Sequence, residues 1–232
     1  AAIGALEGRA LGGLLWGGFV RCVIVQHMTF FINSLAHLWG SRPYSEDNTA
    51  RDNAWLGPFT FGEGYHNFHH KFQADYRNGH RWYQFDCAKW FLNAMQWLGQ
   101  AWRLKRTPEA LILKARLEVE ARQIARRLQE SGVPERMWEK VQSRVENGRE
   151  RLEHAYAQYL NAKLQYRRQR DQWSTDMRKQ WKEKVELYQD ELDEARRRWR
   201  DLVKAMNRIP HPSAQTALSL TVVADILKYK LF

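Results

Sequence analysis

One apolar run near the N-terminus restricts the possible folds of this chain more than any other feature. From Ala10 to Gly40 the sequence contains a single formally charged side chain, Arg21. The run is longer than the ~20 residues that a helix needs to cross the hydrocarbon core of a bilayer. Gly13 and Gly17 form a GxxxG pattern, which lets another membrane helix approach closely. We therefore interpret residues 1–40 as a transmembrane helix region, with the core helix of a soluble protein as the alternative.

Charge is segregated away from this run, so the averages over the chain are misleading. The net charge is +11, but 24 of the 37 basic and 18 of the 26 acidic side chains lie in residues 109–208. Because the two signs are interspersed there, we expect no nucleic-acid partner. Cys22 and Cys87 are the two cysteines of the sequence, which is too few for a disulfide framework or a cysteine-rich metal site.

The rest of the sequence divides into three parts. Residues 41–108 contain helix breakers such as Gly57-Pro58 and many aromatic side chains, which favours a compact cap of loops and short helices. Within this cap we predict a helix from about Phe85 to Lys105. Residues 109–208 are typical of two long, charged helices separated by a break at Ser131-Gly132-Val133-Pro134, that is, a helical hairpin or coiled coil. Residues 209–232 form a tail to which we assign no role.

An apolar seam runs along the second half of the charged segment. Its members recur with spacings of three and four over three heptads: Val185, Tyr188, Leu192, Ala195, Trp199, Leu202 and Met206. Self-association through this seam is the interpretation we favour. Binding of RNA or anionic lipid by arginine runs such as Arg196-Arg197-Arg198 is the alternative, but nearby acidic side chains weaken it.

A histidine cluster carries the strongest chemical signal in the sequence. His66, His69 and His70 lie within five residues, after Gly62-Glu63-Gly64-Tyr65. In a helix, the spacings of three and four place these imidazoles on one face. Neutral imidazole is a common ligand of iron, zinc and copper. The alternative is a surface cluster that responds to pH.

A further histidine on the apolar helix is a candidate fourth ligand. Asn33 and His37 are four residues apart and therefore share one face of that helix. The case for His37 as a ligand depends on the cluster docking above it. Arg42 and Arg51 follow the helix, so the positive-inside rule predicts that this end is cytoplasmic.

The order of these motifs resembles the membrane fatty acid desaturases, most closely the stearoyl-CoA (delta-9) branch. The resemblance covers about residues 10–106. It is carried by motifs quoted in chain order: Asn33-Ser34-Leu35-Ala36-His37, Arg42-Pro43-Tyr44, Gly62 to His70, Asp75-Tyr76-Arg77, Arg81-Trp82, Phe85 to Trp90, and Leu98-Gly99.

The resemblance assigns roles to individual residues. It implies that His66, His69 and His70 are iron ligands from the third histidine box, and that His37 is the extra ligand on the last membrane helix. Asn33 matches the residue that contacts an iron through water. Less directly, Phe30 would line the acyl tunnel. Glu63 and Asp75 are candidates to orient ligand imidazoles, although capping or surface charge explains them equally well. Arg77 and Arg81 are candidates to hold a phosphate-bearing carrier, but we favour their pairing with these two carboxylates.

The resemblance also implies a fold and an activity. The fold is all-α, with membrane helices under a cytosolic histidine-box cap that holds two irons. The activity is oxygen-dependent insertion of a cis double bond into a saturated acyl chain, with O₂ as co-substrate and an external electron donor. Expected partners are a fatty acyl substrate (linked to CoA, carrier protein or lipid), an electron-transfer protein and the membrane. We expect an integral membrane protein with its active site on the cytoplasmic side.

The sequence also departs from the family pattern. The family also needs an earlier HxxxxH and a further HxxHH, and apart from His66–His70 itself neither motif occurs in these 232 residues. The charged segment after residue 108 also lies outside the pattern. We therefore interpret the chain as the C-terminal part of a longer desaturase, inactive by itself. A related membrane di-iron hydroxylase is one alternative. A membrane-anchored coiled-coil scaffold without metal is the other.

Overall fold

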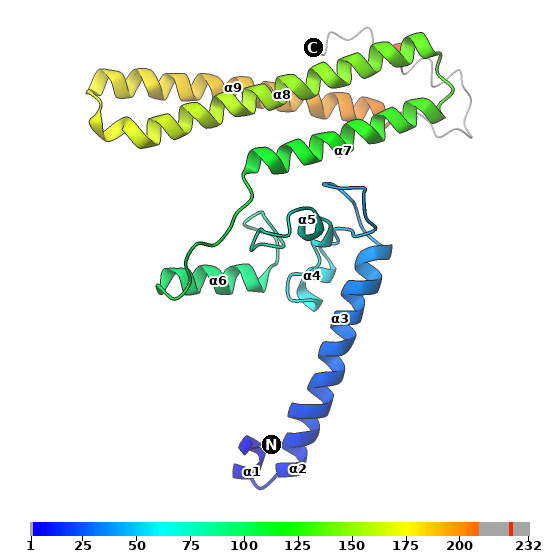
Figure 1. Ribbon diagram of the computed structural model, residues 1–232, viewed down its shortest axis with the longest axis vertical. Coiled ribbons are helices and arrows are strands. Elements are labelled where there is room, and N and C mark those ends of the chain that lie inside the picture. Colours follow the sequence, from blue (N-terminus) through cyan, green and yellow to red (C-terminus); the bar gives the residue numbers. More distant parts are fainter. Residues whose placement is uncertain (1, 209–222, 225–232) are drawn as a thin grey trace. The chain divides into compact units, whose positions relative to one another are not determined.

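The computed structural model describes residues 2–208 and 223–224, and its described residues form helices and loops (Figure 1). The predicted all-α class is confirmed. The chain forms two compact units, residues 1–107 and residues 108–232. The helices of the first unit are α1 (Ala2–Leu6), α2 (Ala10–Leu14), the π-helix η1 (Leu15–Val20), α3 (Arg21–Leu38), α4 (Leu56–Phe59), α5 (His66–Lys71) and α6 (Cys87–Trp97). Those of the second are α7 (Glu109–Glu130), α8 (Glu135–Gln169), the 3₁₀ turn η2 (Arg170–Gln172) and α9 (Thr175–Met206).

The apolar run forms one continuous helix, Ala10–Leu38, made of α2, η1 and α3. Its 29 residues span about 43 Å at 1.5 Å per residue, which exceeds a ~30 Å hydrocarbon core. It is the one helix in the described part of the chain that is long and apolar enough to cross a membrane. The short helix α1 folds back on its start. A side chain at Gly4 would come within 2.8 Å of the Gly13 Cα atom, so the two glycines permit this contact.

Arg51 holds the C-terminal end of this helix against the cap. Its guanidinium donates to the carbonyls of His37 and Gly40, at 3.4 and 3.1 Å. Its backbone amide donates to the Ala36 carbonyl at 2.7 Å. The last carbonyls of a helix have no partner within it, and Arg51 supplies donors to two of them, those of Ala36 and His37.

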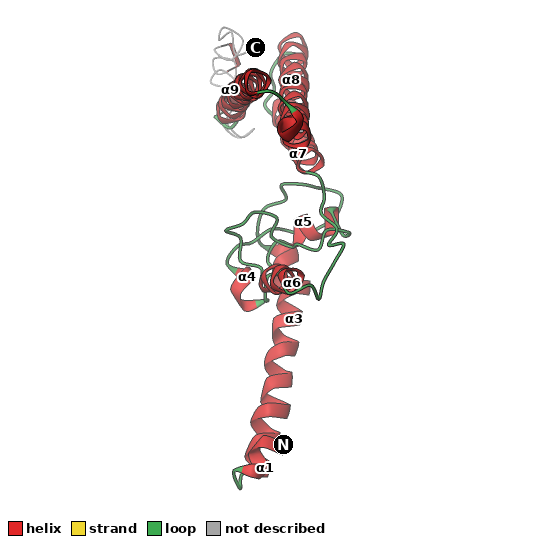
Figure 2. Cartoon of the chain, turned by 90° about the vertical axis from the view of Figure 1, so that its left-hand side faces the viewer, coloured by secondary structure: helices red, strands yellow, loops and turns green. Residues whose placement is uncertain are grey.

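Between α3 and α6 the chain is mostly loop, interrupted by the short helices α4 and α5 (Figure 2). The helix predicted to end at Lys105 ends instead at Trp97. Gly99 has a φ of +72° and donates to the Gln96 carbonyl, while the Gln100 amide donates to the Met95 carbonyl. These two hydrogen bonds form a Schellman motif, which ends a helix at a left-handed glycine.

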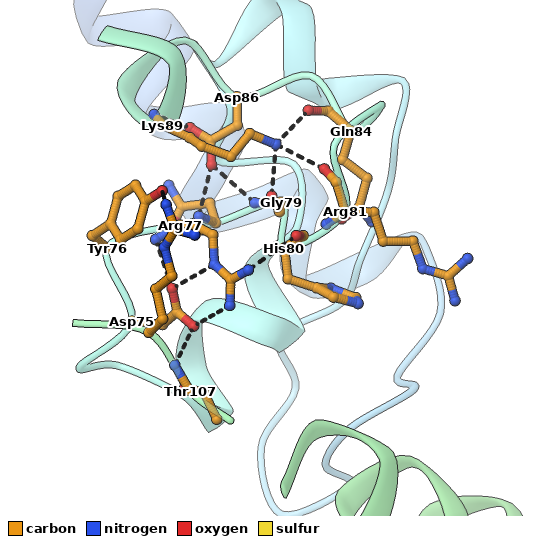
Figure 3. A network of polar contacts seen from close by, with 12 residues as sticks. Asp75, Tyr76, Arg77, Gly79, His80, Arg81, Gln84, Asp86, Lys89 and Thr107 are labelled. Carbon is orange, nitrogen blue, oxygen red and sulfur yellow. Dashed lines mark hydrogen bonds and ion pairs between the residues drawn. The ribbon is translucent and has the colours of Figure 1, made fainter. Parts of the chain in front are cut away.

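Two buried charged side chains, Asp86 and Lys89, organise the loop before α6 through hydrogen bonds to its backbone (Figure 3). The Asp86 carboxylate accepts hydrogen bonds from the backbone amides of Asn78, Gly79 and Lys89, at 2.8–3.0 Å. The Lys89 ammonium donates to the carbonyls of Gly79, Arg81 and Gln84, at 2.8–2.9 Å. Asp86 is therefore the N-cap of α6 and also binds backbone amides of the loop. Lys89 binds backbone carbonyls of the same loop.

The described residues of the second unit form three long helices, whereas two were predicted from the sequence. The expected break at Ser131–Pro134 is present, but α8 and α9 are also separated, by residues 170–174. The Ser174 side chain accepts from the Met177 amide and so forms the N-cap of α9. A serine at this position is a normal helix-start signal, so this second break was readable from the sequence.

The seam predicted on α9 is buried within the chain. Leu192, Trp199, Leu202 and Met206 join residues of α7 and α8 in one hydrophobic core. The Trp199 indole N–H also donates to the Glu120 carboxylate at 2.6 Å. Because the apolar face of α9 is largely covered by its own chain, the seam does not require a second copy. The tail assigned no role lies outside the described residues except for residues 223–224, of which Val223 joins this core.

Candidate metal centre

The short helix α5 presents the histidine cluster, and a remote carboxylate fixes its start. The Phe68 amide donates to the Asp52 carboxylate at 3.1 Å, so Asp52 acts as an N-cap from another segment. The backbone of Asp52 also bridges to Ser41 on one side and Tyr65 on the other. Burial raises the pKa of Asp52 to about 7, against the effect of the amides of Phe68 and Asn67. The first turn of α5 is thereby tied to the chain that follows α3.

Three imidazoles from two helices converge at this point. His66 Nε2 lies 3.1 Å from His37 Nε2 and 3.1 Å from His70 Nε2. Each of these three histidines offers one ring nitrogen, and the three nitrogens all lie within 4.8 Å of one another. His66 and His70 share a face of α5, as their spacing predicts, and His37 comes from the last turn of α3.

His69 lies beside this trio. Its ring is stacked on His66 at 6.0 Å between centroids and lies edge-on to His70 at 5.9 Å. The Nδ1 atoms of His66 and His69 are buried and have no hydrogen-bond partner. Burial, followed by the neighbouring His70, His37 and His69, lowers the pKa of His66 to about 4. Its imidazole is therefore neutral at pH 7, the form that ligates metals.

A hydroxyl group lies beside the histidine on α3. His37 Nδ1 lies 2.8 Å from Thr49 Oγ1, while its Nε2 faces His66. The loop that carries Thr49 is held by the fully buried Asn67. The Asn67 side chain accepts from the amides of Tyr44 and Ser45 and donates to the carbonyls of Ser45 and Ala50. Asn67 thus couples the histidine-box helix to the loop that positions His37.

The glycines of the Gly62-Glu63-Gly64 motif are required by close backbone contacts. A Cβ atom on Gly64 would lie 2.5 Å from both the Asn53 carbonyl oxygen and the Gly57 amide nitrogen. Gly62 has a φ of +114°, and a Cβ atom there would lie 2.9 Å from the Asp86 Cα atom. The motif therefore lets α5 approach the loop after α3 and the start of α6.

The other predicted site residues contact neighbours outside the trio. The Asn33 amide donates to the Thr29 carbonyl on its own helix, and Phe30 is exposed. Glu63 accepts from the Asn78 side chain at 2.7 Å. Asp75 is paired with Arg77 at 2.8 Å and also accepts from the Thr107 amide. The expected pairing of Arg77 with Asp75 is confirmed. Arg81 donates instead to the Tyr83 hydroxyl, so its predicted pairing with a carboxylate is wrong.

Three residues of this site were missed by sequence reasoning. Thr49 and Asp52 lie in the loop after α3, and Asn67 lies inside the histidine cluster, where it was treated as a spacer. No local pattern distinguishes a threonine or an aspartate in a loop from solvent-exposed residues. Asn67 could have been recognised, because it lies between two predicted ligands, and a buried amide at such a position needs hydrogen-bond partners.

A neighbouring histidine lies in the packing beneath the cluster. The His80 ring is stacked on Phe68 at 4.9 Å. Burial, with added repulsion from Arg81 and Arg77, lowers the pKa of His80 to about 4. As the pH falls below 6.5, the unfolded chain takes up this proton before the folded one does. The stability linked to His80 is therefore complete above pH 6.5 and is lost progressively between pH 6.5 and about pH 4.

We expect His80→Phe to remove this part of the acid sensitivity. Thermal unfolding of both proteins in detergent, measured at intervals from pH 7 to pH 4, tests the expectation. The wild-type chain should lose more stability than the variant over that interval. Parallel pH profiles would show that protonation of His80 does not oppose folding.

The donor set fits a transition metal. The trio offers imidazole nitrogens alone, a set that suits iron, zinc or copper. His69 Nδ1, beside the trio, is buried and has no hydrogen-bond partner, so it is a further nitrogen that could bind a metal. The residues present therefore fit a metal group, with His37, His66 and His70 as its first candidate ligands.

Comparison with known proteins identifies the class of the first unit. Residues 1–105 match the fatty acid desaturase family model. The resemblance of the sequence to the fatty acid desaturases is confirmed over these residues, which are 105 of the 232.

Individual relatives support the same assignment. Acyl-CoA desaturase 1 of Saccharomyces cerevisiae is 44% identical over 114 residues, which are 49% of this chain and 22% of the yeast protein. A probable acyl-CoA desaturase of Schizosaccharomyces pombe is 45% identical over 48% of this chain and 23% of its own length. An sn-2 palmitoyl-lipid 9-desaturase of Nostoc is 39% identical over 42% of this chain and 35% of its own length. The chain thus spans about a third or less of these relatives.

Proposed function

We propose that this chain is the C-terminal part of an oxygen-dependent acyl desaturase that introduces a cis double bond, at the delta-9 position, into a saturated acyl chain. The observation that carries this proposal is the convergence of His37, His66 and His70, from the two motifs by which the sequence resembles the family. The relatives named above act as desaturases on acyl-CoA or lipid-linked acyl chains according to their names.

The metal group in this proposal is a pair of irons. His37, His66, His69 and His70 would provide part of the ligand set, and the remaining ligands would come from the family's other histidine boxes, which these 232 residues lack. Such a group, when bound, supplies oxygen activation and hydrogen abstraction from an unactivated methylene, chemistry that no side chain provides. Asn33 as a water-mediated contact and Phe30 as a tunnel residue remain part of the proposal.

The residues of this chain contribute positioning. With a metal on its Nε2, His37 would carry its proton on Nδ1 and would donate a hydrogen bond to Thr49 Oγ1, which lies 2.8 Å away. Asp52 and Asn67 hold α5 and the loop of Thr49 in register. The apolar helix Ala10–Leu38 would place this group at the membrane surface, with the cap on the cytoplasmic side. We also propose that residues 109–208 mediate self-association. A separate electron-transfer protein would supply the electrons.

A chimera tests the function directly. Residues 1–105 replace the matching segment of the yeast acyl-CoA desaturase in a strain that lacks its own enzyme. We expect the chimera to restore monounsaturated fatty acids, measured by gas chromatography, with the double bond at carbon 9. The 232-residue chain expressed alone should form none.

A matched chimera that carries His66→Ala gives the control. It should accumulate in the membrane to the same level and form no unsaturated product. An intact chimera that is abundant but inactive and free of iron would contradict the desaturase proposal and favour the scaffold alternative. Formation of hydroxylated fatty acid would favour the related hydroxylase.

The Thr49 hydrogen bond leads to a separate prediction. We expect Thr49→Val to weaken binding of Co²⁺ or Zn²⁺ by the chain about 10- to 100-fold, the range found when a partner of a metal-bound histidine is removed. The valine keeps the shape of threonine but cannot accept the Nδ1 proton. Titration with Co²⁺ in detergent, followed by its visible absorption, gives the affinity.

Thr49→Ser separates orientation from packing in this experiment. Serine retains the hydroxyl and loses only a methyl group, so affinity should return to within a few-fold of wild type. Equal affinities for the valine and wild-type proteins would mean that Thr49 does not orient His37.

A further inference from the structure

Helix α6 carries an apolar stripe that its own unit leaves largely exposed, although the Phe85 ring contacts Trp90 at 5.1 Å between centroids. Trp90, Phe91, Ala94, Trp97 and Leu98 follow the i, i+1, i+4, i+7, i+8 pattern of one helix face, and all five are exposed. Trp97 is 86% exposed, an unusual value for so large an apolar side chain.

The other faces of α6 are held by the unit. Lys89 is buried in the loop before the helix, and Asn93 accepts from the Tyr76 hydroxyl at 2.7 Å. These contacts fix the rotation of the helix about its axis. The stripe therefore faces outward because of interactions on the opposite side, and it is not free to turn inward.

The direction of α6 indicates what covers the stripe. Figure 1 shows α6 lengthwise and Figure 2 shows it end-on, while α3 is upright in both, so α6 runs across the direction of α3. Both views place α6 at the level of the C-terminal part of α3. With α3 spanning a bilayer, α6 lies parallel to the membrane plane near the end of the span.

The chemistry of this segment matches a lipid–water interface. Tryptophan is enriched at that interface because its ring is apolar and its N–H is polar. From Cys87 to Pro108 the charged side chains are Lys89, Arg103, Lys105 and Arg106, with no Asp or Glu. Arg103 and Lys105 are exposed, and basic groups near an anionic lipid surface are attracted to it. A helix with one apolar face followed by basic residues is typical of interfacial anchors.

We propose that α6 is an interfacial helix, with its stripe of Trp90, Phe91, Ala94, Trp97 and Leu98 inserted among the lipid headgroups and acyl chains. The inference rests on the proposal that α3 spans the membrane. The insertion fixes the cap against the bilayer independently of α3, so the cap is held at two points and cannot tilt about the end of a single helix.

Spin labels test this arrangement in the complete 232-residue chain. The native cysteines Cys22 and Cys87 are replaced by serine, and a nitroxide is attached at Ala94→Cys, on the stripe. A second label at Gln96→Cys, exposed on the other side of the same helix, is the matched control. The labelled chain is placed in nanodiscs of phosphatidylcholine and phosphatidylserine. Collisions with oxygen, which partitions into lipid, are compared with collisions with a water-soluble nickel chelate.

The label at position 94 should have an oxygen-to-nickel collision ratio several-fold higher than the label at position 96. A label at Ile24→Cys, within the span, reports separately on α3. Lipid-like behaviour at position 24 with water-like behaviour at position 94 would overturn the interfacial helix while leaving the span intact. Water-like behaviour at both positions would contradict the span itself. Shielding of position 94 from both reagents would show that protein covers the stripe, which also overturns the inference.

Discussion

Asp86→Ala should destabilise the first unit by about 3 kcal/mol or more, because each buried hydrogen-bond donor left without an acceptor costs about 1–3 kcal/mol. Asp86 is fully buried and accepts three backbone N–H groups, so alanine would leave those donors unsatisfied. It would also leave the Lys89 ammonium buried without its nearest negative charge. A loss of 3 kcal/mol lowers the melting temperature of a unit of this size by about 12 °C or more.

Hydrogen exchange locates this effect, because the helices of the second unit dominate circular dichroism. Peptides that contain Asn78 and Gly79 should lose protection in Asp86→Ala, while peptides from α8 keep theirs. Asp47→Ala is the matched control, because its side chain is 66% exposed and its removal should cost about 0.5 kcal/mol or less. An Asp86→Ala protein as stable as the Asp47→Ala protein would mean that the network in Figure 3 contributes little.

The parts of the site that could be predicted are those that depend on the spacing of nearby residues within one helix. Residues four apart on a helix share a face, so the pairing of His66 with His70 follows from the sequence directly. The meeting of His37 with His66, 29 residues later, does not. It was expected from the family resemblance, and its physical basis lies in a path of loops that no periodic pattern describes.

The residues that fix this path were not predictable for the same reason. Asp52 caps α5 from outside it, and Thr49 meets His37 across a loop whose shape depends on the buried amide of Asn67. The errors in helix ends have a different origin. Gly99 and Ser174 are ordinary stop and start signals, and both lie inside segments that were predicted to be helical.

His66→Ala should weaken binding of Co²⁺ or Zn²⁺ by this chain about 100-fold or more. Structural zinc sites with four ligands are worth about 10–16 kcal/mol, so one ligand corresponds to a few kcal/mol. His66 is also the central member of the trio, because its Nε2 lies 3.1 Å from the Nε2 atoms of both His37 and His70. Its removal therefore takes away the nitrogen that lies next to both of the others. Isothermal titration in detergent gives the affinity, and the number of metal ions per chain gives the stoichiometry.

His154→Ala is the control for the loss of an imidazole, because His154 is exposed on α8 in the other unit. It should bind metal as the wild-type chain does. The melting temperatures of the metal-free proteins show whether the substitution acts on metal binding or on folding. His66 has a buried Nδ1 without a partner, so alanine removes an unsatisfied polar group as well as packing contacts. A His66→Ala protein that melts near wild type and has lost its metal identifies His66 as a ligand. One that keeps its metal affinity would show that the convergence of these imidazoles does not create the binding site.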